Sequence, residues 1–162
     1  MLSPINIISQ LPIHPINRYE RRPLSFISYI VIHHTASDYH TTNIEDIQAA
    51  ARYHVTEKGW PGIGYHYFIT KSGLLFQTNW LSTVSYHIAK QNTPSVGIVF
   101  HGDYSNKEPL EAPMKTAKEL IHYLRKMLPF SEMYGHKEIA HPSSPTICPG
   151  NDWEQWAPNL GD

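Results

Sequence analysis

The chain contains very little cysteine, with Cys148 as the single example among 162 residues. One cysteine cannot close an intramolecular disulfide, whereas small secreted domains usually carry paired cysteines. We therefore expect Cys148 to be a free thiol, a metal ligand, a nucleophile or an intermolecular link.

An excess of charge and a long apolar run are also missing. Lys and Arg number 13 against 14 Asp and Glu, so no overall basic field would attract nucleic acid. No segment reaches the roughly 18 apolar residues of a membrane span, and we expect no membrane insertion. The first 24 residues hold four prolines and no basic stretch ahead of an apolar one, so no signal peptide is expected.

The remaining composition is that of a folded domain. Hydrophobic residues make up 41% and charged residues 17%, which excludes a disordered chain. A chain of 162 residues can bury a substantial core as one domain. We expect residues 1–27, which are rich in proline, to form an arm packed on that domain with little regular structure, and residues 28–162 to form the domain itself.

The residue patterns predict alternating strands and helices. Strands are expected at residues 26–32, 64–70, 74–78, 95–101 and 133–136, the second and third forming a hairpin. Apolar spacing predicts helices at 43–57, capped by Asn43, and at 112–127, with a short helix at 152–156. This order predicts an α/β fold with a mixed central sheet and helices on both faces.

Candidate metal ligands lie at the ends of these elements. The buried strand at 26–32 runs directly into His33 and His34, whose side chains should point to opposite sides of the chain. His136 ends the strand expected at 133–136, and Cys148 follows further downstream in a loop. Two imidazoles and a thiolate form a ligand set that zinc accepts, with a fourth position left for water. Each residue taken alone also fits a structural role, as a hydrogen-bonded histidine or a buried thiol.

Four runs occur together in a fixed order, and their last member contains Cys148. These runs are IVIHHTAS, GYHYFI, YHIAK followed by SVGIVF, and YGHKE followed by TICPG. From Ile30 to Pro149 the chain resembles the zinc-dependent N-acetylmuramoyl-L-alanine amidases of the peptidoglycan-recognition-protein and phage-lysozyme type. The resemblance implies a mixed sheet flanked by helices, a Zn²⁺ cofactor and a peptidoglycan substrate. The implied reaction is hydrolysis of the amide between N-acetylmuramic acid and L-alanine of the stem peptide.

The resemblance also implies roles for individual residues. The zinc ligands of the family fall on His33, His136 and Cys148. Its catalytic tyrosine falls on Tyr65, and Thr146, at the polar position two residues before the cysteine, is the second expected catalytic residue. His87 matches a histidine that lines the family's cleft, and we expect His34 to lie beside the substrate.

The segment between His136 and Cys148 departs from the family pattern because it is a few residues longer, with residues 141–144 as the extra stretch. His141 in this stretch is a rival ligand. We favour His136, because the run Gly-His-Lys-Glu at 135–138 matches the family's order of glycine, histidine, basic and acidic residues.

Other functions fit parts of the same pattern. Non-catalytic relatives bind peptidoglycan without cutting it, but typically lack the cysteine ligand that Cys148 supplies here. A cysteine hydrolase would use Cys148 as nucleophile with a histidine base, and a regulatory protein contact is a third alternative. With no signal peptide and no paired cysteines, we expect a phage endolysin released to the cell wall, or a bacterial autolysin. The sequence predicts no particular oligomeric state.

Overall fold

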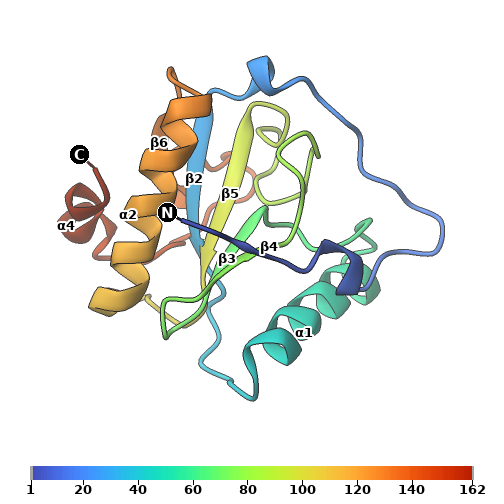
Figure 1. The fold of residues 1–162 in the computed structure, drawn as a ribbon, viewed down its shortest axis with the longest axis horizontal. Coiled ribbons are helices and arrows are strands. Elements are labelled where there is room, and N and C mark those ends of the chain that lie inside the picture. Colours follow the sequence, from blue (N-terminus) through green and yellow to red (C-terminus); the bar gives the residue numbers. More distant parts are fainter. Residues whose placement is uncertain (1, 162) are drawn as a thin grey trace.

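A six-stranded β-sheet runs through the centre of the structure, a computed structural model that describes residues 2–161 (Figure 1). In chain order its strands are β1 (Ile5–Asn6), β2 (Tyr29–His34), β3 (Tyr67–Ile69), β4 (Leu75–Gln77), β5 (Ser95–Phe100) and β6 (Glu132–Gly135). The helices are α1 (Asn43–Thr56), α2 (Glu111–Met127), α3 (His136–Ile139) and α4 (Trp153–Trp156), with 3₁₀ turns at Ile8–Gln10, Leu24–Phe26 and Ala157–Leu160. The mixed α/β fold expected from the sequence is confirmed.

The strands are ordered β1-β4-β3-β5-β2-β6 across the sheet. Only β3 and β4 pair antiparallel among these strands, as the expected hairpin, and the other neighbours run parallel. β2 lies between β5 and β6, so its end is surrounded by the ends of two parallel neighbours. The carboxyl ends of parallel strands are the usual place for a binding site.

The sheet is covered by apolar residues on both faces. α2 contributes Ala117, Leu120, Ile121 and Leu124 to a core that includes alternate residues of β2 and β5 and the C-terminal tryptophans. α1 contributes Ile47 and Ala51 to a second core on the other face, with Phe68, Phe76 and Val99. Alternation along the strands produces this division, because successive side chains point to opposite faces.

Several expected boundaries were wrong by a few residues. Phe26 belongs to a 3₁₀ turn and is 56% exposed, and the strand begins at Tyr29. Thr42 rather than Asn43 caps α1, because its hydroxyl accepts a hydrogen bond from the main-chain N–H of Glu45. The side chain of Ile44, expected on the apolar face of this helix, is instead largely exposed.

The contacts that attach the N-terminal arm to the domain include a strand pairing and a buried arginine. β1 pairs with β4 and adds a two-residue edge to the sheet. Further along, the buried guanidinium of Arg22 donates hydrogen bonds to the main-chain oxygens of Leu81, Asn92 and Thr93. Arg22 therefore holds the arm against the loop between β4 and β5.

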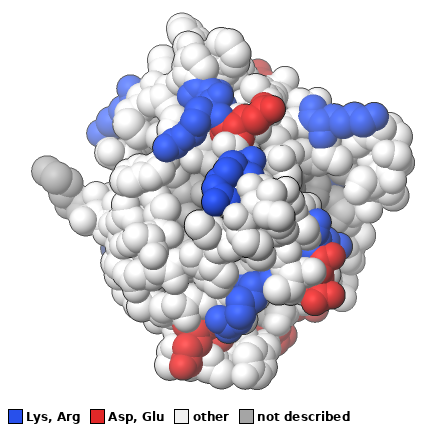
Figure 2. All heavy atoms as spheres, turned by 90° about the vertical axis from the view of Figure 1, so that its right-hand side faces the viewer, with Lys and Arg blue, Asp and Glu red and all other residues white. Residues whose placement is uncertain are grey.

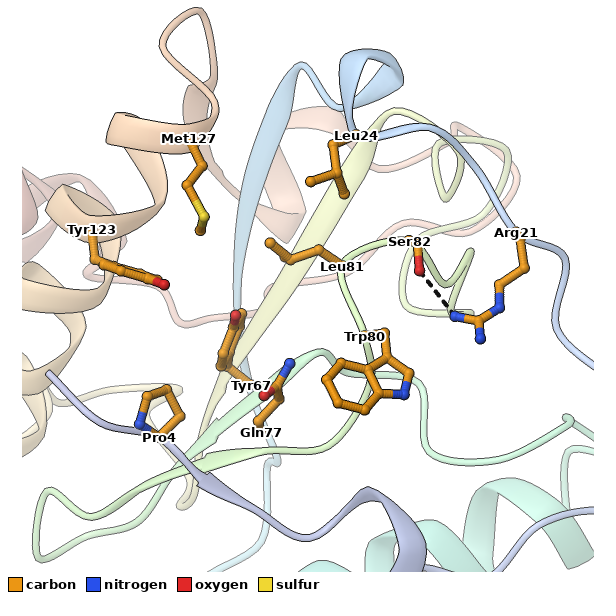
Figure 3. A pocket seen from close by; sticks show the side chains of 10 residues that line it. All are labelled: Pro4, Arg21, Leu24, Tyr67, Gln77, Trp80, Leu81, Ser82, Tyr123 and Met127. Carbon is orange, nitrogen blue, oxygen red and sulfur yellow. Dashed lines mark hydrogen bonds between the residues drawn. The ribbon is translucent and has the colours of Figure 1, made fainter.

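Two features of the surface bear on where a site lies. Figure 2 shows a face on which lysine and arginine side chains stand apart, with acidic side chains among them. A pocket of about 530 Å³ is lined by the arm, β3, β4 and α2, with Tyr67, Trp80 and Tyr123 around it (Figure 3). None of the sequence-predicted site residues lines it, so its size alone does not mark the functional site.

Among residues 2–161, no helix is both long enough and apolar enough to cross a bilayer.

Candidate metal centre

His33, His136 and Cys148 converge at the end of β2. One ligand atom from each lies within 4.8 Å of the others. Sγ of Cys148 is 3.7 Å from Nδ1 of His33. Two ligands of a tetrahedral zinc ion, at about 2.1 Å for nitrogen and 2.3 Å for sulfur, lie roughly 3.6 Å apart. The donor set and its spacing therefore fit a zinc ion.

A second histidine orients His33. Nε2 of His33 lies 2.9 Å from Nδ1 of His87, and Nε2 of His87 lies 3.1 Å from Oγ of Ser95. The hydroxyl of Ser95 in turn donates to the main-chain oxygen of Gln91. These bonds fit one direction of donation, in which His33 donates to His87 and His87 donates to Ser95. Nδ1 of His33 is then left with its lone pair toward the cluster.

Gly97 makes this arrangement sterically possible. A Cβ atom at Gly97 would lie 2.8 Å from Cγ of His87. Real Cβ contacts are longer than this, so the imidazole of His87 can pack against β5 only where the strand carries no side chain. The glycine in the SVGIVF run therefore makes room for the imidazole that contacts His33.

The Gly-His-Lys-Glu run places His136 at the start of α3. The carboxylate of Glu138 accepts hydrogen bonds from the main-chain N–H of Gly135 at 2.6 Å and from the indole N–H of Trp153 at 2.7 Å. The main-chain N–H of Lys137 donates to the carbonyl oxygen of Cys148 at 2.7 Å. This run thus ties the turn that carries His136 to the loop that carries Cys148.

The loop around Cys148 brings its sulfur to β2. The main-chain N–H of His34 lies 3.4 Å from Sγ and donates toward it. The hydroxyl of Thr146 accepts a hydrogen bond from the main-chain N–H of Cys148 at 3.1 Å. An N–H directed at sulfur favours a thiolate, which is the form that binds metal.

Burial sets the protonation of these groups. It lowers the pKa of His33 well below 6.5 and, with His34 nearby, lowers the pKa of His136 to about 4. Both imidazoles are therefore neutral at pH 7, as metal ligation requires. Burial also raises the pKa of the Cys148 thiol to about 12, so a thiolate here needs a cationic partner.

One pocket of about 250 Å³ contains all of the site residues expected from the sequence except the rival ligand His141. It is lined by the three cluster residues together with His34, Tyr65, His87 and Thr146. The ring of Tyr65 lies against that of His33, with 5.4 Å between centroids. Burial raises the pKa of Tyr65, so its hydroxyl stays protonated.

His34 and His141 have other contacts. Nδ1 of His34 accepts a hydrogen bond from the main-chain N–H of Tyr104, although the residue still lines the pocket. His141 lies outside the cluster, and its Nδ1 contacts the hydroxyl of Ser143. The extra residues 141–144 therefore do not separate His136 from Cys148.

The sequence did not single out His54, which lies behind Tyr65. Its ring packs against Trp60 and Tyr65, and its Nδ1 accepts a hydrogen bond from the N–H of Gly64. Both His54 and Val55 lie at positions whose spacing fits the apolar face of α1. The periodicity of the sequence therefore could not show whether His54 is an ordinary core residue or a histidine that packs against Tyr65.

The chain is similar in sequence to proteins of known family. Residues 21–151 match the family model described as N-acetylmuramoyl-L-alanine amidase. Peptidoglycan-recognition protein SC1a of Drosophila melanogaster is 31% identical over 147 residues, which cover 82% of this chain and 77% of the relative.

Solved structures agree with the sequence matches. The amidase LysC of Clostridium intestinale has 25% identity and a TM-score of 0.75, covering 99% of this chain and 98% of its own. The Ph2119 endolysin of a Thermus scotoductus bacteriophage has 30% identity and a TM-score of 0.73, covering 89% and 90%. The family match spans most of the chain, including the whole stretch from β2 to Cys148. The chain therefore belongs to the N-acetylmuramoyl-L-alanine amidase family.

Proposed function

We propose that this protein is a zinc-dependent amidase that hydrolyses the bond between N-acetylmuramic acid and L-alanine in peptidoglycan. The observation that carries the proposal is the convergence of His33, His136 and Cys148 in one pocket with Tyr65. The family match supports the reaction class, and a peptidoglycan-recognition protein at 31% identity supports the substrate.

His33, His136 and Cys148 would hold the ion. Bound there, zinc would acidify a water molecule to a pKa of about 7 and polarise the scissile carbonyl. Two neutral imidazoles and one thiolate leave a net charge near +1, which preserves this Lewis acidity. The main-chain N–H of His34, which donates toward Sγ of Cys148, would help to stabilise the thiolate.

Tyr65 is the side chain that would act on the substrate carbonyl. Its hydroxyl is protonated, and its ring is fixed between His33 and His54. A positioned hydroxyl donor can stabilise the oxyanion that develops as the amide is attacked. The hydroxyl of Thr146 accepts from the N–H of Cys148, so its own proton is available for donation into the pocket.

His87 would act through His33. Both of its ring nitrogens have partners within the protein, which supports a positioning role over the substrate-lining role expected from the sequence. The proton that His33 shares with His87 would keep Nδ1 of His33 directed at the ion.

The protonation states that burial favours at Cys148 and His33 argue against cysteine nucleophilic chemistry. A cysteine hydrolase needs a thiolate beside an imidazolium. Here burial raises the pKa of Cys148 to about 12 and leaves the nearby His33 neutral.

The test is release of new amino termini from purified cell walls. We expect release by the purified protein, loss after chelation and recovery on addition of Zn²⁺. A non-catalytic binding module would bind the walls without releasing amino termini. Activity that survives complete removal of metal would contradict the zinc mechanism.

A further inference from the structure

A second group of potential metal ligands lies outside the pocket described above. His40 is in the connection from β2 to α1, Asp46 is in the first turn of α1, and His101 directly follows β5. One ligand atom from each lies within 4.8 Å of the others. We propose that these three residues form a second site for a divalent transition metal, with Zn²⁺ as the ion that the two imidazoles and one carboxylate suit best.

His101 has a free lone pair in a buried position. Its Nε2 lies 3.0 Å from the main-chain oxygen of Tyr39, so Nε2 carries the proton and Nδ1 does not. The side chain is 4% exposed, and Nδ1 has no hydrogen-bond partner within residues 2–161. Buried polar atoms are rarely left without a partner. Metal-binding histidines commonly donate a hydrogen bond from one ring nitrogen to a carbonyl oxygen and bind the metal through the other nitrogen. His101 has the same arrangement.

Asp46 directs one oxygen at both histidines. Its Oδ1 accepts hydrogen bonds from the main-chain N–H and the hydroxyl of Thr41. Oδ2 lies 3.8 Å from Nδ1 of His101, which is too long for a hydrogen bond and close to the roughly 3.4 Å between two ligands of a tetrahedral ion. Burial alone would raise the pKa of Asp46, but the bonds from Thr41 and His40 keep it below its usual value. The carboxylate is therefore ionised.

His40 closes the group from the solvent side. Its Nδ1 lies 2.5 Å from Oδ2 of Asp46, a hydrogen bond whose proton a metal ion would replace. The side chain is 47% exposed, so the ring has room to adjust to ligand distances. Binding would release the shared proton to solvent as the ion takes its place.

An ion at this site would join three separate segments. It would tie the connection that follows β2 to α1 and to the end of β5. Asp46 and His101 also line a pocket of about 410 Å³. Tyr65 lines this pocket and also the pocket that contains His33, His136 and Cys148. The fourth position of the ion would face this pocket, where water or a ligand carboxylate can complete the coordination.

The test counts Zn²⁺ bound to metal-depleted protein by equilibrium dialysis and metal analysis. We expect two equivalents for the wild-type protein and one for His40→Ala. The side chain of His40 is exposed, so its removal should leave the fold intact. Cys148→Ser should retain one equivalent, and the double variant should retain none. His122→Ala, which removes an exposed histidine on α2, is the control and should bind two.

Cobalt distinguishes the two sites independently of activity. The first site should give a thiolate-to-cobalt charge-transfer band, whereas Co²⁺ bound at the second site should add only ligand-field absorption. Saturation of the wild-type protein at one equivalent that His40→Ala retains and Cys148→Ser loses would overturn the proposal. Retention of two equivalents by both His40→Ala and His101→Phe would overturn it as well.

Discussion

Nε2 of His33 and Nδ1 of His87 lie 2.9 Å apart, so a residue outside the ligand set fixes the tautomer of the first ligand. We expect His87→Ala to weaken Zn²⁺ binding about 10- to 100-fold, because His33 loses the acceptor that orients it. His87→Gln retains an acceptor and should recover part of this affinity. The measurement is the Kd for Zn²⁺ by competition with a chelator. A raised KM with an unchanged Kd would instead identify His87 as a substrate contact.

Cys148→Ser should remove wall hydrolysis and weaken zinc binding at the first site, because a neutral hydroxyl is a far poorer ligand than a thiolate. The fold should persist, since the substitution changes one atom at a site that is 8% exposed. Metal content, wall hydrolysis and far-UV circular dichroism check the three parts. An active serine variant with a full complement of zinc would show that Cys148 is not a ligand.

Tyr65→Phe should leave zinc binding unchanged and lower turnover by about tenfold to a thousandfold, because only the hydroxyl donor is lost. Tyr67→Phe is the matched control, since Tyr67 packs in the core on the α2 side and lines the pocket of Figure 3. Steady-state kinetics on purified walls measure the effect. Equal turnover in both variants would make the Tyr65 hydroxyl a bystander.

Arg22→Ala should lower the free energy of unfolding by about 2–4 kcal/mol, because several main-chain oxygens would lose a buried donor. Arg18→Ala is the control, since Arg18 is exposed and bonds only to oxygens within the arm. Urea unfolding of both variants gives the comparison. A similar loss for the two would mean that the arm is not held through Arg22.

Stability should fall as the pH drops from about 6.5 toward about 4. Burial lowers the pKa of His54 to about 4 and of His66 to about 3, against 6.5 when unfolded. Between these values the unfolded chain binds protons that the folded chain does not. Each group therefore removes up to about 1.4 kcal/mol per pH unit.

Neither His54 nor His66 belongs to the group formed by His33, His136 and Cys148, so the loss of stability should occur with and without metal. Urea unfolding at about pH 8, 6.5 and 5 measures it. His54→Phe should flatten part of the pH dependence. A free energy of unfolding that stays constant over this range would show that these histidines are accessible to protons in the folded state.

Local patterns predicted most of the fold. Apolar spacing placed α2 within one residue, and its expected stripe is buried at Ala117, Leu120, Ile121 and Leu124. β1 was missed because a two-residue edge strand has no periodicity of its own and forms only where β4 accepts it.

By itself, the sequence determined strands β2 to β6, helices α1, α2 and α4, and the ordered motifs around His33, Tyr65, His136 and Cys148. Those features depend on spacing along the chain, which the sequence displays directly. The tertiary structure alone decided that Cys148 reaches the end of β2, that His87 packs on Gly97 and orients His33, and that His101 faces Asp46 with an unpaired nitrogen. These contacts join segments brought together by the pairing of parallel strands, whose order and register no local pattern specifies.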